Sequence, residues 1–186
     1  DRSVSRGLGD VYKRQAIYKS KVTAWITEFV DEQLATNKEY YESIFSQNDV
    51  KRYEDYGRLY KSLAFYLRSD IEHGLVTGYN SRPRDMINNV LQEIQKGNVT
   101  IDKDILISLL NKTLELRKQF GGVPNADYVI DALVPFISLL DETKLSEKAK
   151  EVLDDEEIIA TLRKSPATTS NVNARLRRVK QMIAVN

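Results

Sequence analysis

The fold is decided by residues 49–73, which read DVKRYEDYGRLYKSLAFYLRSDIEH. Aromatic and aliphatic side chains recur there at a 3-4-3-4 spacing, and a second apolar strip lies beside the first. The two strips comprise Tyr53, Tyr56, Tyr60, Leu63 and Leu67, and then Leu59, Tyr66 and Ile71. A stripe this wide is typical of a helix that its neighbours contact from two sides. The stretch therefore predicts a central helix, about 37 Å long at 1.5 Å per residue, that ends at Gly74.

The same period of about 3.6 residues runs through almost the whole chain, whereas sustained strand-like alternation is hard to find. We therefore expect an all-α fold, a single-domain bundle of about seven or eight helices. Pro135 interrupts the apolar segment 128–140, so a kink or a break is expected after Leu133 or Val134. The side chains expected in the core are Trp25, Phe29, Tyr60, Leu63, Leu67, Leu109, Leu110 and Val129.

Residues 1–15 stand apart from this pattern. The string VSRGLGDVYKRQ at residues 4–15 resembles translated sequencing-adapter read-through, and such segments are excluded from fold reasoning. The alternative is a flexible basic arm that binds nucleic acid. On the first interpretation the natural polypeptide begins near Ala16, with its true start cut away, and the domains are a helical bundle at 16–164, a linker at 165–171 and a basic helix at 172–186.

Composition excludes several classes of protein. The chain has 28 Lys and Arg against 27 Asp and Glu; four of those cations and two of those anions lie in residues 1–15, which leaves 24 against 25. A balance so near neutral gives no general argument for nucleic acid or an anionic membrane as partner. The absence of cysteine excludes disulfides, thiolate nucleophiles and cysteine-type metal sites, and a cytoplasmic location is the simpler expectation.

The remaining motifs favour structural roles. His73 is the only histidine, so a multi-histidine metal centre is impossible, and we expect it to interact with helix carbonyls rather than to act as a base with Asp70. The pair Gly121-Gly122 lacks the context of a phosphate-binding loop and predicts an interhelical turn. The acids at 154–157 point to different helix faces, which favours a solvated helix junction over a cation site. We expect no catalytic residue, no metal and no cofactor.

Six of the ten tyrosines lie between Tyr40 and Tyr66, interleaved with basic residues that include Arg58 and Lys61. Aromatic and basic side chains in alternation can stack on single-stranded nucleic acid. The helical spacing of Tyr56 and Tyr60 favours core packing instead.

The C-terminal segment carries the main functional hypothesis. After Glu157 the chain has six cations and no acid. The last helix combines a narrow apolar stripe with charges off that stripe, and such a helix can present cations to an anionic partner. The residues expected to make this contact are Arg175, Arg177, Arg178 and Lys180. Residues 141–157 hold eight acids against three lysines, so the same helix can instead fold back onto them.

We therefore expect a non-enzymatic interaction or assembly module that contacts a protein or nucleic acid through its C-terminal basic helix. The alternative is an accessory helical domain of a larger enzyme whose catalytic part lies upstream of the sequence given. Binding to nucleic acid would weaken steeply with salt, whereas a detached domain would expose apolar surface.

Overall fold

The computed structural model describes residues 13–184. A short helical turn at residues 13–17 comes first, and ten α-helices, one 3-10 helix and one small hairpin follow between Lys21 and Ala184. The all-α prediction is confirmed. The number of helices exceeds the predicted seven or eight because the segments 49–73 and 128–140 are each divided.

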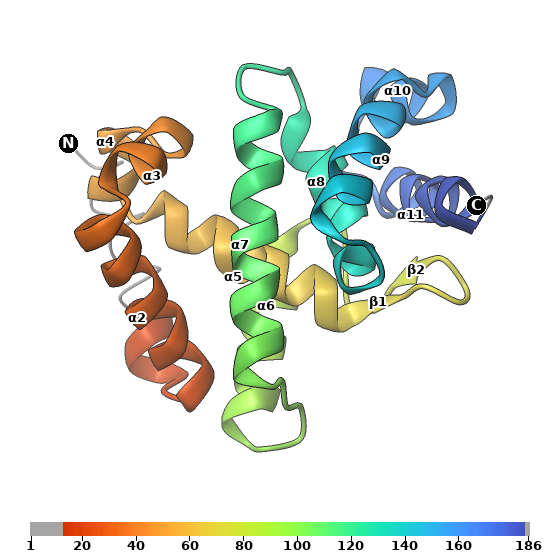
Figure 1. The fold of residues 1–186 in the computed structure, drawn as a ribbon. Coiled ribbons are helices and arrows are strands. Elements are labelled where there is room, and N and C mark those ends of the chain that lie inside the picture. The colour runs from red at the N-terminus through yellow and green to blue at the C-terminus, as the bar shows by residue number, and fades with distance from the viewer. Residues whose placement is uncertain (1–12, 185–186) are drawn as a thin grey trace.

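Figure 1 shows the helices and the two short strands of the chain. They are α2 Lys21–Thr36, α3 Lys38–Ile44, α4 Gln47–Lys51, α5 Glu54–Arg68, β1 Ser69–Asp70, β2 Leu75–Val76, α6 Pro83–Gln95, α7 Lys103–Gln119, α8 Ala126–Leu133, η1 Val134–Leu139, α9 Glu142–Asp154, α10 Glu156–Arg163 and α11 Thr169–Ala184. The prediction for residues 1–15 concerns mostly residues outside the described part of the chain. Within that part, Arg14 Nε donates to Asn88 Oδ1 over 2.8 Å.

The single long helix expected over 49–73 is wrong at both ends. A capping box between Ser46 and Asp49 starts α4 early, and Tyr53 ends that turn in the left-handed region at φ 57°. α5 then stops at Arg68, because the next residues pair as strands in which Ser69 faces Val76. Gly74, at φ 65°, supplies the left-handed residue that this tight turn requires.

The centre of the bundle is α5, as the stripe predicts. It contacts α4, α6, α7, α8 and η1, and α7 crosses it in Figure 1. Six of the eight predicted core side chains are buried, while Trp25 and Leu67 are partly buried against the core. Core packing is confirmed for Tyr56 and Tyr60, whereas Tyr53 is exposed at the helix start.

The break at Pro135 is confirmed, since α8 ends at Leu133 and a 3-10 helix carries the chain on to Leu139. Proline cannot donate the hydrogen bond that would continue an α-helix, and short 3-10 segments accommodate it.

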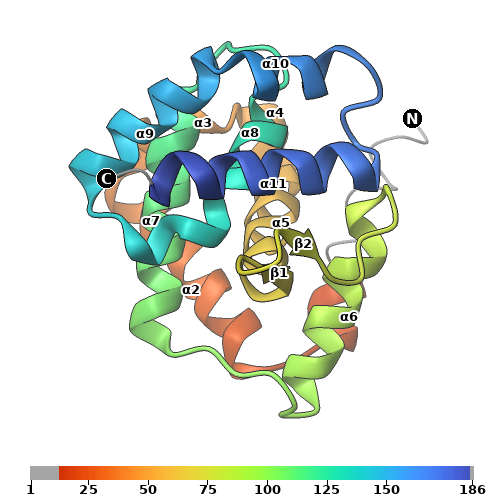
Figure 2. The same cartoon turned by 90° about the vertical axis from the view of Figure 1, so that its right-hand side faces the viewer.

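The last helix, α11, lies across the bundle with α10 on one side and the hairpin on the other (Figure 2). It contacts α8, α9, α10 and β2, and its Val172, Leu176 and Val179 are buried. It begins at Thr169, three residues before the predicted start, within the predicted linker. In the described part of the chain, no helix is both long and apolar enough to cross a bilayer.

Candidate functional site

The four basic residues predicted to contact a partner occupy different environments on α11. Arg175 is 1% exposed, in the middle of the apolar stripe. Its Nη2 donates to the carbonyl of Pro166 over 2.6 Å, and its Nη1 donates to Thr161 Oγ1 over 3.1 Å. Burial lowers the pKa of this guanidinium. Arg175 is therefore not exposed for direct contact with an external partner. It lies on the buried face of α11, three residues after Val172 and four before Val179.

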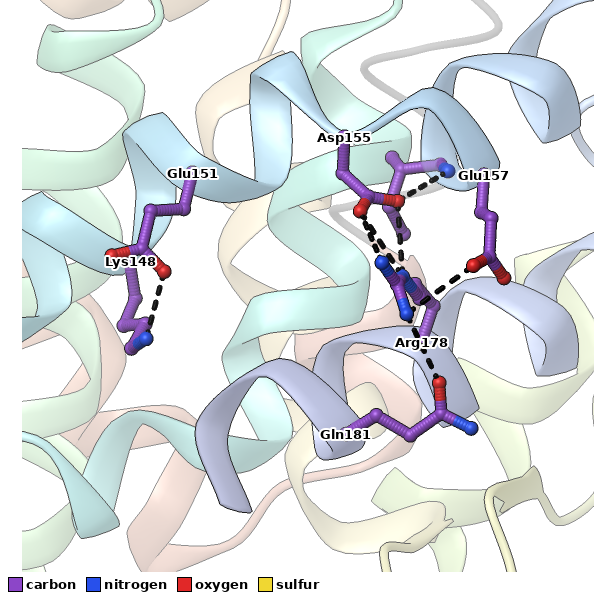
Figure 3. Close-up of polar contacts among 7 residues, drawn as sticks. Lys148, Glu151, Asp155, Glu157, Arg178 and Gln181 are labelled. Carbon is purple, nitrogen blue, oxygen red and sulfur yellow. Dashed lines mark hydrogen bonds and ion pairs between the residues drawn. The ribbon is translucent and has the colours of Figure 1, made fainter. Parts of the chain in front are cut away.

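Arg178 binds the acidic junction between α9 and α10 (Figure 3). Its Nε donates to both carboxylate oxygens of Asp155 over 3.1 Å, its Nη2 donates to Oδ2 over 2.7 Å, and its Nη1 lies 3.2 Å from Glu157 Oε1. The side-chain hydrogen bonds from Arg178 lower the pKa of Asp155. The fold-back of the basic helix onto residues 141–157 is thus realised at this residue.

Arg177 and Lys180 lie beside the hairpin instead. Arg177 Nη1 donates to the carbonyl of Gly74 over 3.4 Å, and Lys180 Nζ donates to the carbonyl of Glu72. Arg177 is exposed and Lys180 is half-buried. The structure therefore does not gather the four predicted residues on one open face.

A cleft of about 510 Å³ lies elsewhere, where α5, α7 and α8 meet. This volume falls within the roughly 300–1,000 Å³ of sites that bind small molecules. Its charged lining consists of Arg58 and Lys61 from α5, Arg117 from α7, and Asp127 and Asp131 from α8. Three cations against two carboxylates give this lining one net positive charge.

The cations of the cleft are incompletely paired. Lys61 Nζ lies 3.1 Å from Asp131 Oδ2, and Arg117 Nη1 donates to Asp127 Oδ1. Arg117 is only 7% exposed, yet its Nε and Nη2 have no hydrogen-bond partner. Arg58 is half-buried, and its guanidinium makes no hydrogen bond or ion pair with any residue between 13 and 184.

The two carboxylates differ in their protonation. Burial tends to raise the pKa of Asp127, but the positive charges of Lys61, Arg117 and Arg58 outweigh it, so the pKa is lowered. For Asp131 burial dominates over the same cations and raises the pKa. Asp131 Oδ1 is also buried without a partner. Asp127 is therefore the carboxylate that stays ionised as the pH falls.

The N-terminus of α8 completes the cleft. Gly121, Gly122 and the first turn of α8 line it, and Asn125 enters the helix at φ 60° without a side-chain cap. The amides of Ala126 and Tyr128 donate to the carbonyls of Val123 and Asn125, and the start of the helix carries partial positive charge. Gly121-Gly122 is an interhelical turn, as predicted, and this turn contributes to the cleft.

The opposite wall comes from distant parts of the chain. Tyr79 and Ala167 line the cleft together, and the Tyr79 hydroxyl donates to the Ala167 carbonyl over 2.7 Å. Phe65 and Tyr128 add aromatic surface. The predicted linker, residues 165–171, therefore borders the cleft.

The other sequence candidates lie outside this cleft. His73 stands in the hairpin turn rather than in a helix, and its Nδ1 lies 2.7 Å from Asp70 Oδ2. The acids at 154–157 form the predicted helix junction, where Asp155 caps α10. Between residues 13 and 184, no three His, Asp or Glu side chains converge as a metal would require.

Sequence reasoning missed the cleft, although it singled out some of its parts. Arg58 and Lys61 are three residues apart on one helix, a spacing that places them on one face. Arg117 follows them by more than fifty residues, and only tertiary packing brings it close. Comparison with protein-family models, with curated proteins and with solved structures gave no match.

Proposed function

We propose that this chain is a helical binding module that takes an anionic group of its ligand, a carboxylate or a phosphate, into the cleft between α5, α7 and α8. The observation that carries the proposal is a set of donors without acceptors. Arg58 makes no hydrogen bond or close ion pair in the described part of the chain, and Nε and Nη2 of the buried Arg117 are unsatisfied.

Buried donors that lack partners cost free energy, about 1–3 kcal/mol for each group. Native proteins keep few of them, and those that persist call for an explanation such as a ligand. Carboxylate and phosphate oxygens are the acceptors that a guanidinium matches best. The N-terminus of α8, which has no side-chain cap, lines the same cleft, and the partial positive charge of a helix N-terminus favours anions.

The proposed ligand is anionic, as the sequence leads us to expect, but the proposed site is the cleft and not α11. On α11, Arg175 and Arg178 already have acceptors within the chain. Arg177 and Lys180 also donate within the chain, to the hairpin carbonyls of Gly74 and Glu72. The cleft, in contrast, has cations that lack acceptors.

Amide NMR spectroscopy tests the proposal at the site itself. Gly121 and Gly122 line the cleft, and the amide signals of glycine fall in an uncrowded region of the spectrum. We expect their signals to shift saturably with inorganic phosphate or with acetate, and not with chloride at equal ionic strength. The two titrations distinguish a phosphate-bearing ligand from a carboxylate-bearing one.

Arg58→Gln should weaken the binding of the effective anion by about tenfold or more, because a charge-assisted hydrogen bond is worth about 1.5–3 kcal/mol. Arg68→Gln is the matched control, since Arg68 lies on the same helix and donates to Asn89 outside the cleft. Equal affinity in wild type and Arg58→Gln, or no saturable shift in the wild type, would show that the proposal is wrong.

A further inference from the structure

We infer that Arg175, from inside the protein, is a positioning residue of the cleft, through which the docking of α11 controls the affinity for the ligand. The inference rests on the proposed function. The sequence predicts that Arg175 contacts a partner directly; we assign it an indirect role instead.

Arg175 holds the backbone of the far wall. Its Nη2 donates to the carbonyl of Pro166, and the next carbonyl, that of Ala167, accepts from the hydroxyl of Tyr79. Tyr79 and Ala167 both line the cleft. One side chain of α11 and one side chain of the cleft thus hold two successive peptide groups, and the loss of either bond removes one restraint on that wall.

Arg175 also supports the neighbouring wall. Its guanidinium carbon lies 5.3 Å from the centre of the Tyr128 ring. Phe65, Tyr128 and Asp131 line the cleft and also a small gap beneath α11 that Arg175 borders. Phe65, Tyr128 and Asp131 thus border both Arg175's surroundings and the ligand site.

The wall at residues 165–168 depends on α11 for its shape. Ser165 and Ser81 adopt left-handed backbones at φ 51° and 66°, which cost free energy in residues other than glycine unless their surroundings hold them. Asn171 Nδ2 donates to the carbonyls of Lys164 and Ser165, and Thr169 N donates to Ser81 Oγ. The first turn of α11 supplies the atoms that keep this wall in place.

An arginine is a costly choice at this position for stability alone. It interrupts an apolar stripe, its burial disfavours the charge, and its Nε has no partner. Replacing a buried charge by a well-packed apolar residue is often neutral or stabilising. The directional bonds of Arg175 to Pro166 and Thr161 are what an apolar residue could not supply.

The experiment compares two ways of loosening α11. Arg175→Met removes the bonds to Pro166 and Thr161, whereas Arg178→Gln removes the hydrogen bonds to Asp155, and neither Arg178 nor Asp155 lines the cleft. The urea midpoint of each variant is measured first, so that binding is compared only where the protein is folded. At a temperature where both are folded, we expect only Arg175→Met to weaken binding of the effective anion, inorganic phosphate or acetate, by about tenfold, in the range of typical coupling energies.

Tyr79→Phe gives a second measurement if Arg175→Met does not fold. It keeps the ring but removes the bond to Ala167, and we expect weaker anion binding with little change in stability. Equal affinity in Arg175→Met or, failing that, Tyr79→Phe would overturn the inference, as would an equal loss in Arg178→Gln. Loss of binding in Arg58→Gln alone would leave the proposed function standing, whereas absence of binding in the wild type would remove both.

Discussion

At the scale of single residues, Tyr41 and Asp55 form a hydrogen bond sealed from water. The hydroxyl donates to Asp55 Oδ2 over 2.9 Å, and the two residues are 0% and 1% exposed. Burial raises the pKa of Asp55 against the lowering effect of this bond, and Asp55 Oδ1 already lacks a partner. The carboxylate therefore depends on the tyrosine.

We expect Tyr41→Phe to lower the free energy of unfolding by about 1–3 kcal/mol, because it leaves a buried acceptor unsatisfied. Urea denaturation at neutral pH measures this. Tyr66→Phe is the control, since the Tyr66 hydroxyl contacts Ser138 at the surface and its loss should cost less than about 0.5 kcal/mol. Similar losses in both variants would contradict the role given to Asp55.

At the scale of elements, the hairpin and α11 meet at Gly74. A Cβ atom at this position would lie 2.1 Å from Cγ of Arg177, so the glycine allows the helix to approach the turn. Gly78 also has a positive φ, of 76°, but a Cβ there would meet nothing within 4 Å. Both glycines are required for their positive φ, but only Gly74 is also required for close packing against α11.

We expect Gly74→Ala to lower the free energy of unfolding by more than Gly78→Ala, whose own cost is about 1 kcal/mol because alanine is strained at positive φ. Thermal denaturation of both variants measures the difference. In an Arg177→Ala background, which keeps only the Cβ contact at 3.3 Å, most of the excess cost of Gly74→Ala should disappear. If Gly74→Ala keeps its full cost there, the contact with α11 is not the cause.

Prediction from sequence succeeds at this scale where a local signal decides the element. Pro135 divides α8 from η1, and the stripe of α5 is largely buried. It fails at the ends of the central helix, because apolar spacing cannot distinguish a helix that continues through Ile71 from a chain that turns back to pair Ser69 with Val76.

At the scale of the whole molecule, Arg178 joins α11 to the junction of α9 and α10. Its hydrogen bonds hold the pKa of Asp155 below the ordinary value. A carboxylate whose pKa is lower in the folded state stabilises the fold above its unfolded pKa of about 3.9, and this contribution disappears as the pH falls through the folded value.

We therefore expect Arg178→Gln to lower the melting temperature by a few degrees at pH 7, and by progressively less as the pH falls below the unfolded pKa of about 3.9 towards the lowered pKa of Asp155 in the folded state. Calorimetry at several pH values follows this convergence. Lys148→Gln is the control, because Lys148 pairs with Glu151 on its own helix, as Figure 3 shows. A loss in Arg178→Gln that does not change with pH would exclude the Asp155 contact as its source.

The sequence by itself determined the helical class, the buried face of α5, the break at Pro135 and the turn at Gly121-Gly122. Each of these follows from side-chain spacing or backbone chemistry within a few residues. Only the tertiary structure decided that Arg175 turns inward, that Arg178 binds Asp155, and that Arg58, Arg117 and the start of α8 share a cleft. Those outcomes depend on which helix faces pack together. Packing is decided by burial and charge interactions between residues that are distant in the chain.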